Sequence, residues 1–199
     1  MDHGHTIESL ILFEQRVAEA FEAGKIRAPI HLCSGTQAEP LLDIFREIQA
    51  DDWVCSNWRG HFHALLKGVP EDEVFRQIAD GRSMFLASRP HRFVASAIVG
   101  GVLPIACGLA LAIQRRRGPE WVNVFVGDMA ERTGLYHEFA QYVRGHDLRV
   151  RVYVEDNGLS TNVPTEEVWG RYSGPRPLVR RYTYRRTRPH TGTGRRVTF

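Results

Sequence analysis

Two short segments, each placed directly after an apolar run rich in β-branched residues, constrain this chain most. They are Gly127-Asp128-Met129-Ala130 and Glu155-Asp156-Asn157-Gly158. The runs before them, residues 121–126 and 148–154, are predicted strands, and residues 133–145 between them predict a helix. A strand, a helix and a second strand of this length form a parallel unit, which places ligands beyond the carboxyl ends of its strands. The two segments occupy those ends.

The rest of the chain also alternates helices and strands, which predicts an α/β fold in one domain. Its 199 residues, of which 43% are hydrophobic, suffice for one ordinary core. We expect leading helices over residues 1–50, a core over 51–170 and an arginine-rich strand and loop over 171–199. Helices are predicted at 6–23, 36–48, 61–66, 70–79 and 103–115, strands at 53–56 and 179–184, and a long functional loop at 82–96.

No apolar run near the start of the chain is long enough for a secretory signal or a membrane span. The longest covers only residues 10–13. We therefore expect a soluble cytoplasmic protein that does not contact a membrane. Cys33, Cys55 and Cys107 are odd in number and scattered, which predicts reduced core thiols.

Positive charge is concentrated at the C-terminal end, where residues 171–199 carry nine arginines and no acidic residue. A basic segment can bind nucleic acid through its phosphates. Residues 179–184 alternate as a strand, however, and the chain has no recognisable nucleic-acid-binding module. We therefore expect no nucleic-acid partner. The arginines would instead contact an anionic cofactor, contact an acidic partner surface, or face solvent.

Asp128 and Asn157 offer side-chain oxygens of the kind that Mg²⁺ prefers, and the carbonyl of Leu159 could add another. Magnesium seldom has a cage made only of protein and shares its remaining positions with water and substrate phosphates. The alternative is that Asp128 caps a helix and Asn157 shapes a turn, as these residue types often do.

Several motifs, taken in order, resemble the alpha subunit of thiamine-diphosphate-dependent 2-oxoacid dehydrogenases, the E1 component. Residues 127–138 with 156–161 resemble that family's thiamine diphosphate signature. Residues 31–39, 58–61, 96–108 and 183–191 resemble further family motifs. The resemblance covers roughly residues 28–195. It implies a three-layer α/β/α fold with a mainly parallel sheet, the thiamine diphosphate-binding fold, in which 51–170 form the cofactor-binding core.

The resemblance also implies a role for each matched residue. In the segment Trp58-Arg59, the guanidinium would hold the diphosphate as a charge-assisted fork. Backbone contacts are implied for Val99 with the aminopyrimidine ring and for Gly127, Met129 and Ala130 with the diphosphate. Ligands to Mg²⁺ would be Asp128, Asn157 and the Leu159 carbonyl.

Two histidines are candidate catalytic residues. His190 matches a family loop, and a histidine near the reactive carbon of the cofactor can transfer a proton or steady an anionic intermediate at neutral pH. His61 lies two residues after the predicted cofactor arginine and would line the entrance to the site, although a packing role is equally open.

The resemblance implies an enzyme that works only with a partner. The matched motifs all belong to the diphosphate side of the family's site, so the pyrimidine-binding domain and its activating glutamate would come from a beta subunit, in an α₂β₂ assembly. Such an enzyme decarboxylates a 2-oxo acid and passes the acyl group to a lipoyl group, such as that of a lipoyl-bearing acyltransferase, or to another acceptor.

Two alternatives remain open. The first is a split transketolase-like or acyloin-forming subunit, which uses the same cofactor with a different donor and acceptor. The second is a degenerate, non-catalytic partner subunit. It is motivated by Met129, which stands where the family has a glycine, and by the short stretch between Thr161 and Leu178.

Overall fold

The structure, a computed structural model, describes residues 4–33, 35–171 and 178–194. Its helices are α1 (Ile7–Glu22), α2 (Gly35–Glu47), α3 (His61–Leu66), α4 (Glu71–Gln77), α5 (Val102–Arg115), α6 (Asp128–Glu131), α7 (Gly134–Gly145) and α8 (Thr165–Trp169), with a π-helical turn (Ile78–Arg82) and a 3₁₀ turn (Ser83–Phe85) after α4. Its strands are β1 (Trp53–Ser56), β2 (Ala87–Ser88), β3 (Phe93–Ala95), β4 (Val122–Gly127), β5 (Val150–Asp156), β6 (Leu159–Ser160), β7 (Val163–Pro164) and β8 (Val179–Thr183).

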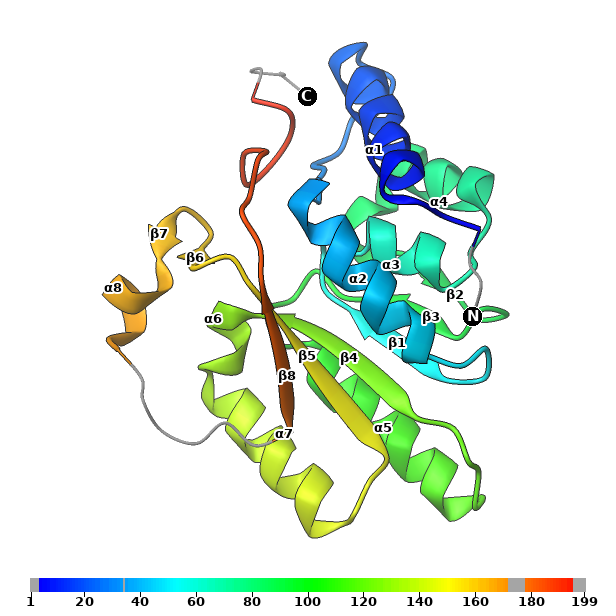
Figure 1. The fold of residues 1–199 in the computed structure, drawn as a ribbon, viewed down its shortest axis with the longest axis vertical. Coiled ribbons are helices and arrows are strands. Elements are labelled where there is room, and N and C mark those ends of the chain that lie inside the picture. The colour runs from blue at the N-terminus through cyan, green and yellow to red at the C-terminus, as the bar shows by residue number, and fades with distance from the viewer. Residues whose placement is uncertain (1–3, 34, 172–177, 195–199) are drawn as a thin grey trace.

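Six strands form one sheet in the order β2-β3-β1-β4-β5-β8 (Figure 1). Every pair in it is parallel except the short antiparallel pair of β2 with β3. The carboxyl ends of β3, β1, β4, β5 and β8 therefore lie along the same edge. The predicted unit of β4, α7 and β5 is present, and its two strands pair in parallel over six residue pairs.

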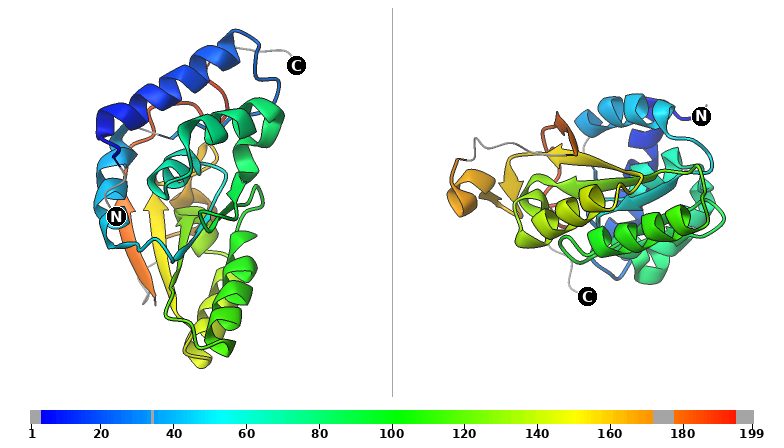
Figure 2. Two further views of the ribbon diagram at one scale, coloured as in Figure 1. Left: turned by 90° about the vertical axis from the view of Figure 1, so that its right-hand side faces the viewer. Right: turned by 90° about the horizontal axis from the view of Figure 1, so that it is seen from below.

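Helices cover both faces of the sheet, because the central strands alternate between two apolar clusters. On β4, Val122, Val124 and Val126 pack in the cluster that contains α5 and α7, whereas Phe125 packs in the cluster that contains α1, α2 and α3. Figure 2 shows the helices on the two sides of the strands. This is the three-layer α/β/α arrangement with a mainly parallel sheet that was predicted.

The predicted long loop at 82–96 is wrong in part, since it contains β2 and β3. The strand β3 is only three residues long, but it pairs in parallel with β1 and extends the sheet on that side. Phe93 and Ala95 are buried, and Val94 between them is partly buried. Three residues are too few to show a repeating pattern, which is why no strand was predicted here.

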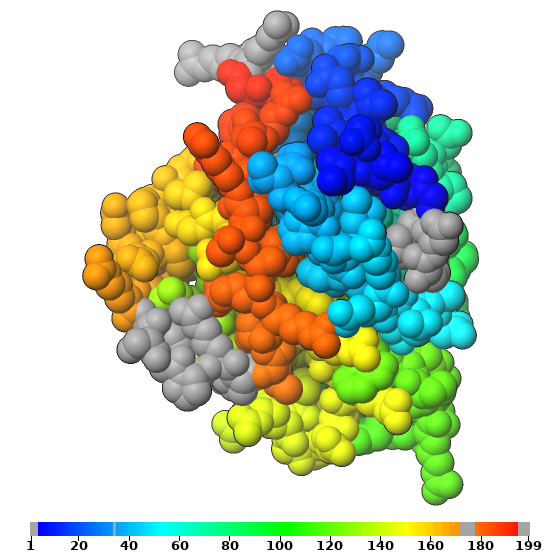
Figure 3. Space-filling view, in the orientation of Figure 1, coloured from blue at the N-terminus to red at the C-terminus, as the bar shows by residue number. Residues whose placement is uncertain are grey.

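The strand β8 lies at the far edge of the sheet, beside β5, and the chain after it runs along the surface next to α2 (Figure 3). Arg180 pairs with Glu47 of α2. Arg181 pairs with Glu131 at 2.7 Å and with Asp156 at 2.5 Å. Both arginines thus serve contacts within the fold. The arginines at 176, 195 and 196 lie outside the described residues.

Within the described ranges, the helices are too short or too polar to cross a membrane.

Candidate functional site

A cavity of about 200 Å³ lies at the carboxyl edge of the parallel sheet. Its walls come from five segments, residues 57–59, 98–102, 126–130, 155–161 and 184–190. Each segment follows one of the five parallel strands, β1, β3, β4, β5 and β8, or includes its last residues. The parallel topology therefore gathers residues that are up to 133 positions apart in the chain, from Asn57 to His190, around one space.

The structure brings ten of the eleven predicted site residues to this cavity. They are Trp58, Arg59, Val99, Gly127, Asp128, Met129, Ala130, Asn157, Leu159 and His190. Asp128 begins α6 directly after β4, and Asn157 follows the last residue of β5. Their proximity follows from the pairing of β4 with β5, whose last pair is Gly127 with Glu155.

The eleventh predicted residue, His61, does not line the cavity. It begins α3, a short helix whose six residues are all buried, and its own side chain is fully buried. Its Nε2 lies 2.9 Å from the hydroxyl of Ser83, and its Nδ1 lies 3.3 Å from a carboxylate oxygen of Glu14. The turn after Arg59 directs this histidine into the core, where its contacts fit a packing role.

One end of the cavity is cationic. Arg59 is 7% exposed, and its guanidinium donates a hydrogen bond to the carbonyl of His190 at 3.2 Å and lies 3.1 Å from His190 Nδ1. Its Nε has no hydrogen-bond partner, and neither has the indole Nε1 of Trp58 beside it. Among the described residues, Arg59 forms no ion pair with a carboxylate. A buried cation without a counter-charge is costly, so this end fits an anion.

The positive charges of Arg59 and Arg186 affect the neighbouring histidines. Burial, together with the charges of Arg59 and Arg186, lowers the pKa of His190 below its ordinary value. Burial and the charge of Arg59 lower the pKa of His31 to about 3. The two rings meet edge to face with their centroids 4.9 Å apart. His190 is therefore mainly neutral at pH 7 and can accept a proton or a hydrogen bond.

The cavity also carries oxygen ligands. Asp128 is 4% exposed, and burial raises its pKa, while the hydrogen bond from the Thr165 hydroxyl acts in the opposite direction. Asn157 donates from Nδ2 to the Tyr184 hydroxyl at 2.8 Å, and its Oδ1 accepts the backbone N–H of Leu159 at 3.0 Å. Asn157 thus does shape a turn, as the alternative interpretation expected, and it does so at the cavity wall.

No cluster of three or more His, Cys, Asp or Glu side chains suited to a metal occurs within the part of the chain that the structure describes. The predicted magnesium ligands at the cavity are the Asp128 carboxylate, the Asn157 amide oxygen and the Leu159 carbonyl, which are hard oxygens. That set suits Mg²⁺ when an anionic ligand and water complete its coordination.

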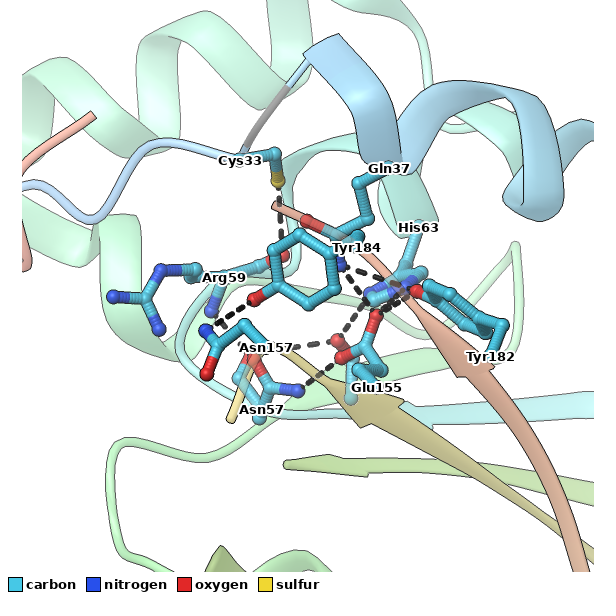
Figure 4. A network of polar contacts seen from close by, with 10 residues as sticks. Cys33, Gln37, Asn57, Arg59, His63, Glu155, Asn157, Tyr182 and Tyr184 are labelled. Carbon is cyan, nitrogen blue, oxygen red and sulfur yellow. Dashed lines mark hydrogen bonds and ion pairs between the residues drawn. The ribbon is translucent and has the colours of Figure 1, made fainter. Parts of the chain in front are cut away.

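At the wall of the cavity, a polar network surrounds Glu155, the penultimate residue of β5 (Figure 4). Glu155 is 3% exposed, and its carboxylate accepts hydrogen bonds from the amide of Gln37 at 2.6 Å, the amide of Asn57 and the hydroxyl of Tyr182. His63 Nε2 lies 3.1 Å from Glu155 Oε1, but outside hydrogen-bond geometry. Burial raises the pKa of Glu155, yet His63 and the donors outweigh it and leave the pKa below its ordinary value.

This network reaches the cationic end of the cavity through Asn57. The side-chain oxygen of Asn57 accepts the backbone N–H of Arg59 at 2.8 Å, while its amide donates to Glu155. The Cys33 thiol donates to the Arg59 carbonyl at 3.2 Å. The segment that carries Trp58 and Arg59 is therefore held from both sides by buried partners.

Sequence reasoning missed several residues that line the cavity, among them Asn57, Tyr184 and Arg186. Arg186 contacts the carbonyl of Thr161 at 2.5 Å and Oδ1 of Asn162 at 3.0 Å. Burial and the charge of Arg59 lower its pKa. The signal for Arg186 was the basic C-terminal segment, but nothing in the sequence distinguished it from the other eight arginines there.

Several known proteins are similar to this chain in sequence. The model of the family described as dehydrogenase E1 component matches residues 6–169. The alpha subunit of acetoin:2,6-dichlorophenolindophenol oxidoreductase from Bacillus subtilis is 29% identical over 164 residues, covering 77% of this chain and 49% of that protein. The pyruvate dehydrogenase E1 alpha subunit of Porphyra purpurea is 30% identical over 162 residues, covering 73% and 47%. A chloroplastic pyruvate dehydrogenase E1 alpha subunit of Oryza sativa is 28% identical over 165 residues, covering 73% and 39%.

The chain spans about half the length of the first two relatives. The family match nevertheless runs from α1 to α8 and includes four of the five strands whose ends form the cavity. With the predicted fold and this match in agreement over most of its length, the chain belongs to the dehydrogenase E1 component family.

Proposed function

We propose that this chain is the diphosphate- and Mg²⁺-binding alpha subunit of a thiamine diphosphate enzyme. The observation that carries this proposal is the buried guanidinium of Arg59, which has no carboxylate partner among the described residues and lies in the same cavity as Asp128 and Asn157. A diphosphate with its magnesium ion matches both kinds of group in the cavity, since it offers anionic oxygens to the arginine and takes oxygen ligands from the protein.

The residues of the cavity fit this group in detail. The unpartnered Nε of Arg59 and Nε1 of Trp58 are donors that an anion can satisfy. Asp128, Asn157 and the Leu159 carbonyl would hold Mg²⁺, and the backbone at Gly127, Met129 and Ala130 would face the diphosphate. Val99, in the turn before α5, would meet the aminopyrimidine ring. Arg186 adds a second guanidinium at the same cavity.

When bound, thiamine diphosphate supplies the nucleophilic carbon and the electron sink for decarboxylation. The part of this chain is to orient and to move protons. His190 is fixed by Arg59 and by its loop, because Thr191 Oγ1 lies 3.2 Å from His31 Nε2 and the N–H of Gly192 donates to the Ile30 carbonyl at 2.8 Å. Because Nδ1 faces the Arg59 donor, the neutral imidazole carries its proton on Nε2 and would offer that N–H to a developing anion.

We propose that the substrate is a 2-oxo acid, and that the acyl group passes to a lipoyl group or another acceptor. A beta subunit would supply the pyrimidine-binding domain and the activating glutamate in a cytoplasmic α₂β₂ assembly. Support for a partner comes from the cavity rim, where Ile98 is 72% exposed and Val99 46% exposed. Apolar side chains this exposed beside a ligand cavity are typical of a surface that another subunit covers.

A second candidate is an acyloin-cleaving or acyloin-forming subunit, which the similarity to the acetoin oxidoreductase alpha subunit favours. The two reactions differ in their products. Release of carbon dioxide from a 2-oxo acid supports the first candidate, whereas turnover of an acyloin without carbon dioxide supports the second.

The test uses the full chain purified with its co-expressed partner. Isothermal titration calorimetry with thiamine diphosphate in Mg²⁺ should give a clear binding signal for the parent and a loss of at least tenfold in affinity for Asp128→Ala. Glu138→Ala, on the exposed surface of α7, is the matched control and should bind like the parent. Equal binding by Asp128→Ala and the parent would refute the site. No binding and no thermal stabilisation in the parent would favour the non-catalytic partner subunit.

A further inference from the structure

One buried side chain, Thr165, joins both loops that carry the proposed magnesium ligands. Thr165 is 3% exposed and is the first residue of α8. Its hydroxyl donates to Asp128 Oδ2 at 2.5 Å, and its backbone N–H donates to the carbonyl of Gly158 at 2.9 Å. Gly158 lies between Asn157 and Leu159. The same residue therefore contacts the carboxylate after β4 and the turn after β5.

The hydroxyl contact constrains how Asp128 can present its carboxylate. A carboxylate has two oxygens and rotates about its last bond unless something fixes it. Thr165 engages Oδ2, so that Oδ1 is the oxygen left for a ligand. A group that orients a metal ligand in this way commonly changes metal affinity by 10- to 100-fold when it is removed.

Helix α8 is itself fastened to α6 at its other end. The indole N–H of Trp169 contacts the sulfur of Met129, and Arg132 donates to the carbonyl of Gly170 at 3.0 Å. The side chain of Met129 is therefore engaged by α8. These contacts hold the five-residue helix α8 against the strand end that carries Asp128.

We propose that Thr165 is a positioning residue for Asp128, and that α8 is the support that carries it. This inference rests on the proposed function, because it assumes that Asp128 binds Mg²⁺. It gives a structural role to the short stretch after Thr161, which contains α8, and to Met129. Where the family has a glycine, the side chain of Met129 anchors the supporting helix.

The experiment compares Thr165→Val, which keeps the shape but loses the hydroxyl, with Thr165→Ser, which keeps the hydroxyl. In the complex with the co-expressed partner, calorimetry gives the Mg²⁺ concentration for half-maximal binding of thiamine diphosphate. We expect that concentration to rise about tenfold or more in Thr165→Val and to stay within about threefold of the parent in Thr165→Ser. Thr183→Val, an exposed position at the end of β8, is the control and should match the parent.

A purely structural role would lower the thermal midpoint of the ligand-free Thr165→Val complex without changing its Mg²⁺ requirement, and that result would overturn the proposal. Equal Mg²⁺ requirements in Thr165→Val and the parent would do so as well. If the parent binds no thiamine diphosphate at any Mg²⁺ concentration, the proposed function itself fails, and the two failures are thereby distinguished.

Discussion

Replacing Glu155 by alanine should destabilise the chain more than any exposed substitution. Three donors point at its carboxylate, from the buried Gln37 and the partly buried Asn57 and Tyr182. A buried donor that loses its partner costs about 1–3 kcal/mol. The three losses are not additive because they share one acceptor, and breaking a buried charged network typically costs about 3–5 kcal/mol in total. We expect a loss in that range.

The measurement is urea unfolding of the purified protein, followed by circular dichroism at pH 7. Glu155→Gln keeps the shape and one acceptor oxygen, so we expect about half the loss of the alanine variant. Glu138→Ala removes an exposed carboxylate and should stay within about 0.5 kcal/mol of the parent. A loss below about 1 kcal/mol in Glu155→Ala would refute the reasoning, because it would mean that the three donors find other partners or water.

The network also predicts a pH dependence with a definite sign. The folded-state pKa of Glu155 lies below its ordinary value of 4.5, so the unfolded chain takes up the proton first as the pH falls. The stability that the carboxylate contributes is therefore complete above about pH 4.5 and is lost as the pH falls through the folded-state pKa. The difference in unfolding free energy between the parent and Glu155→Gln should narrow below pH 4.5. A difference that stays constant through this range would contradict the assignment.

Three other predictions concern the scaffold. Thr6 accepts the N–H of Ser9 in a capping box at the start of α1, so Thr6→Ala should lower the unfolding free energy by about 1 kcal/mol in urea titrations. Phe125 is fully buried and stacks on His63 and Tyr153, so Phe125→Ala should lower the unfolding free energy by about 3–5 kcal/mol in the same assay. An unchanged unfolding free energy would contradict this prediction. Burial lowers the pKa of Lys67 to about 8, so between pH 8 and 10.5 the unfolded chain binds more protons than the folded one. As the pH rises through this range, the unfolding free energy of the parent should therefore increase by about 1–2 kcal/mol relative to that of Lys67→Met. A difference in unfolding free energy that does not change with pH would exclude this.

Strand ends predicted the magnesium ligands of the site, whereas the resemblance to the family supplied the other site residues. Asp128 and Asn157 follow long runs of valine, and the rule that parallel strands end at one edge was sufficient to place them together. The same rule could not be applied to β3, because its three residues show no pattern and the strand was not recognised. Ile98 and Gly100, which follow it, were consequently not placed at the cavity.

The direction of a side chain after a strand end could not be predicted. Arg59 and His61 are two residues apart, yet one faces the cavity and the other lies in the core. The turn that begins α3 decides this, and its geometry depends on contacts from distant elements, such as the Cys33 thiol on the Arg59 carbonyl. Spacing in the sequence carries no information on such contacts. Arg186 was missed for a related reason, since it lies three residues beyond the end of β8 and outside any alternating pattern.

The contact between Arg59 and His190 joins residues that are 131 positions apart. During synthesis on a ribosome, the segment with Arg59 emerges long before β8 and the loop that carries His190. A nascent chain of 150 residues could already pair β1 with β4, but it would lack two walls of the cavity. The cavity is therefore complete only after synthesis has passed His190. A cellular step that senses an occupied cavity would report on the folding of everything from Asn57 to His190, and not on one strand or loop alone.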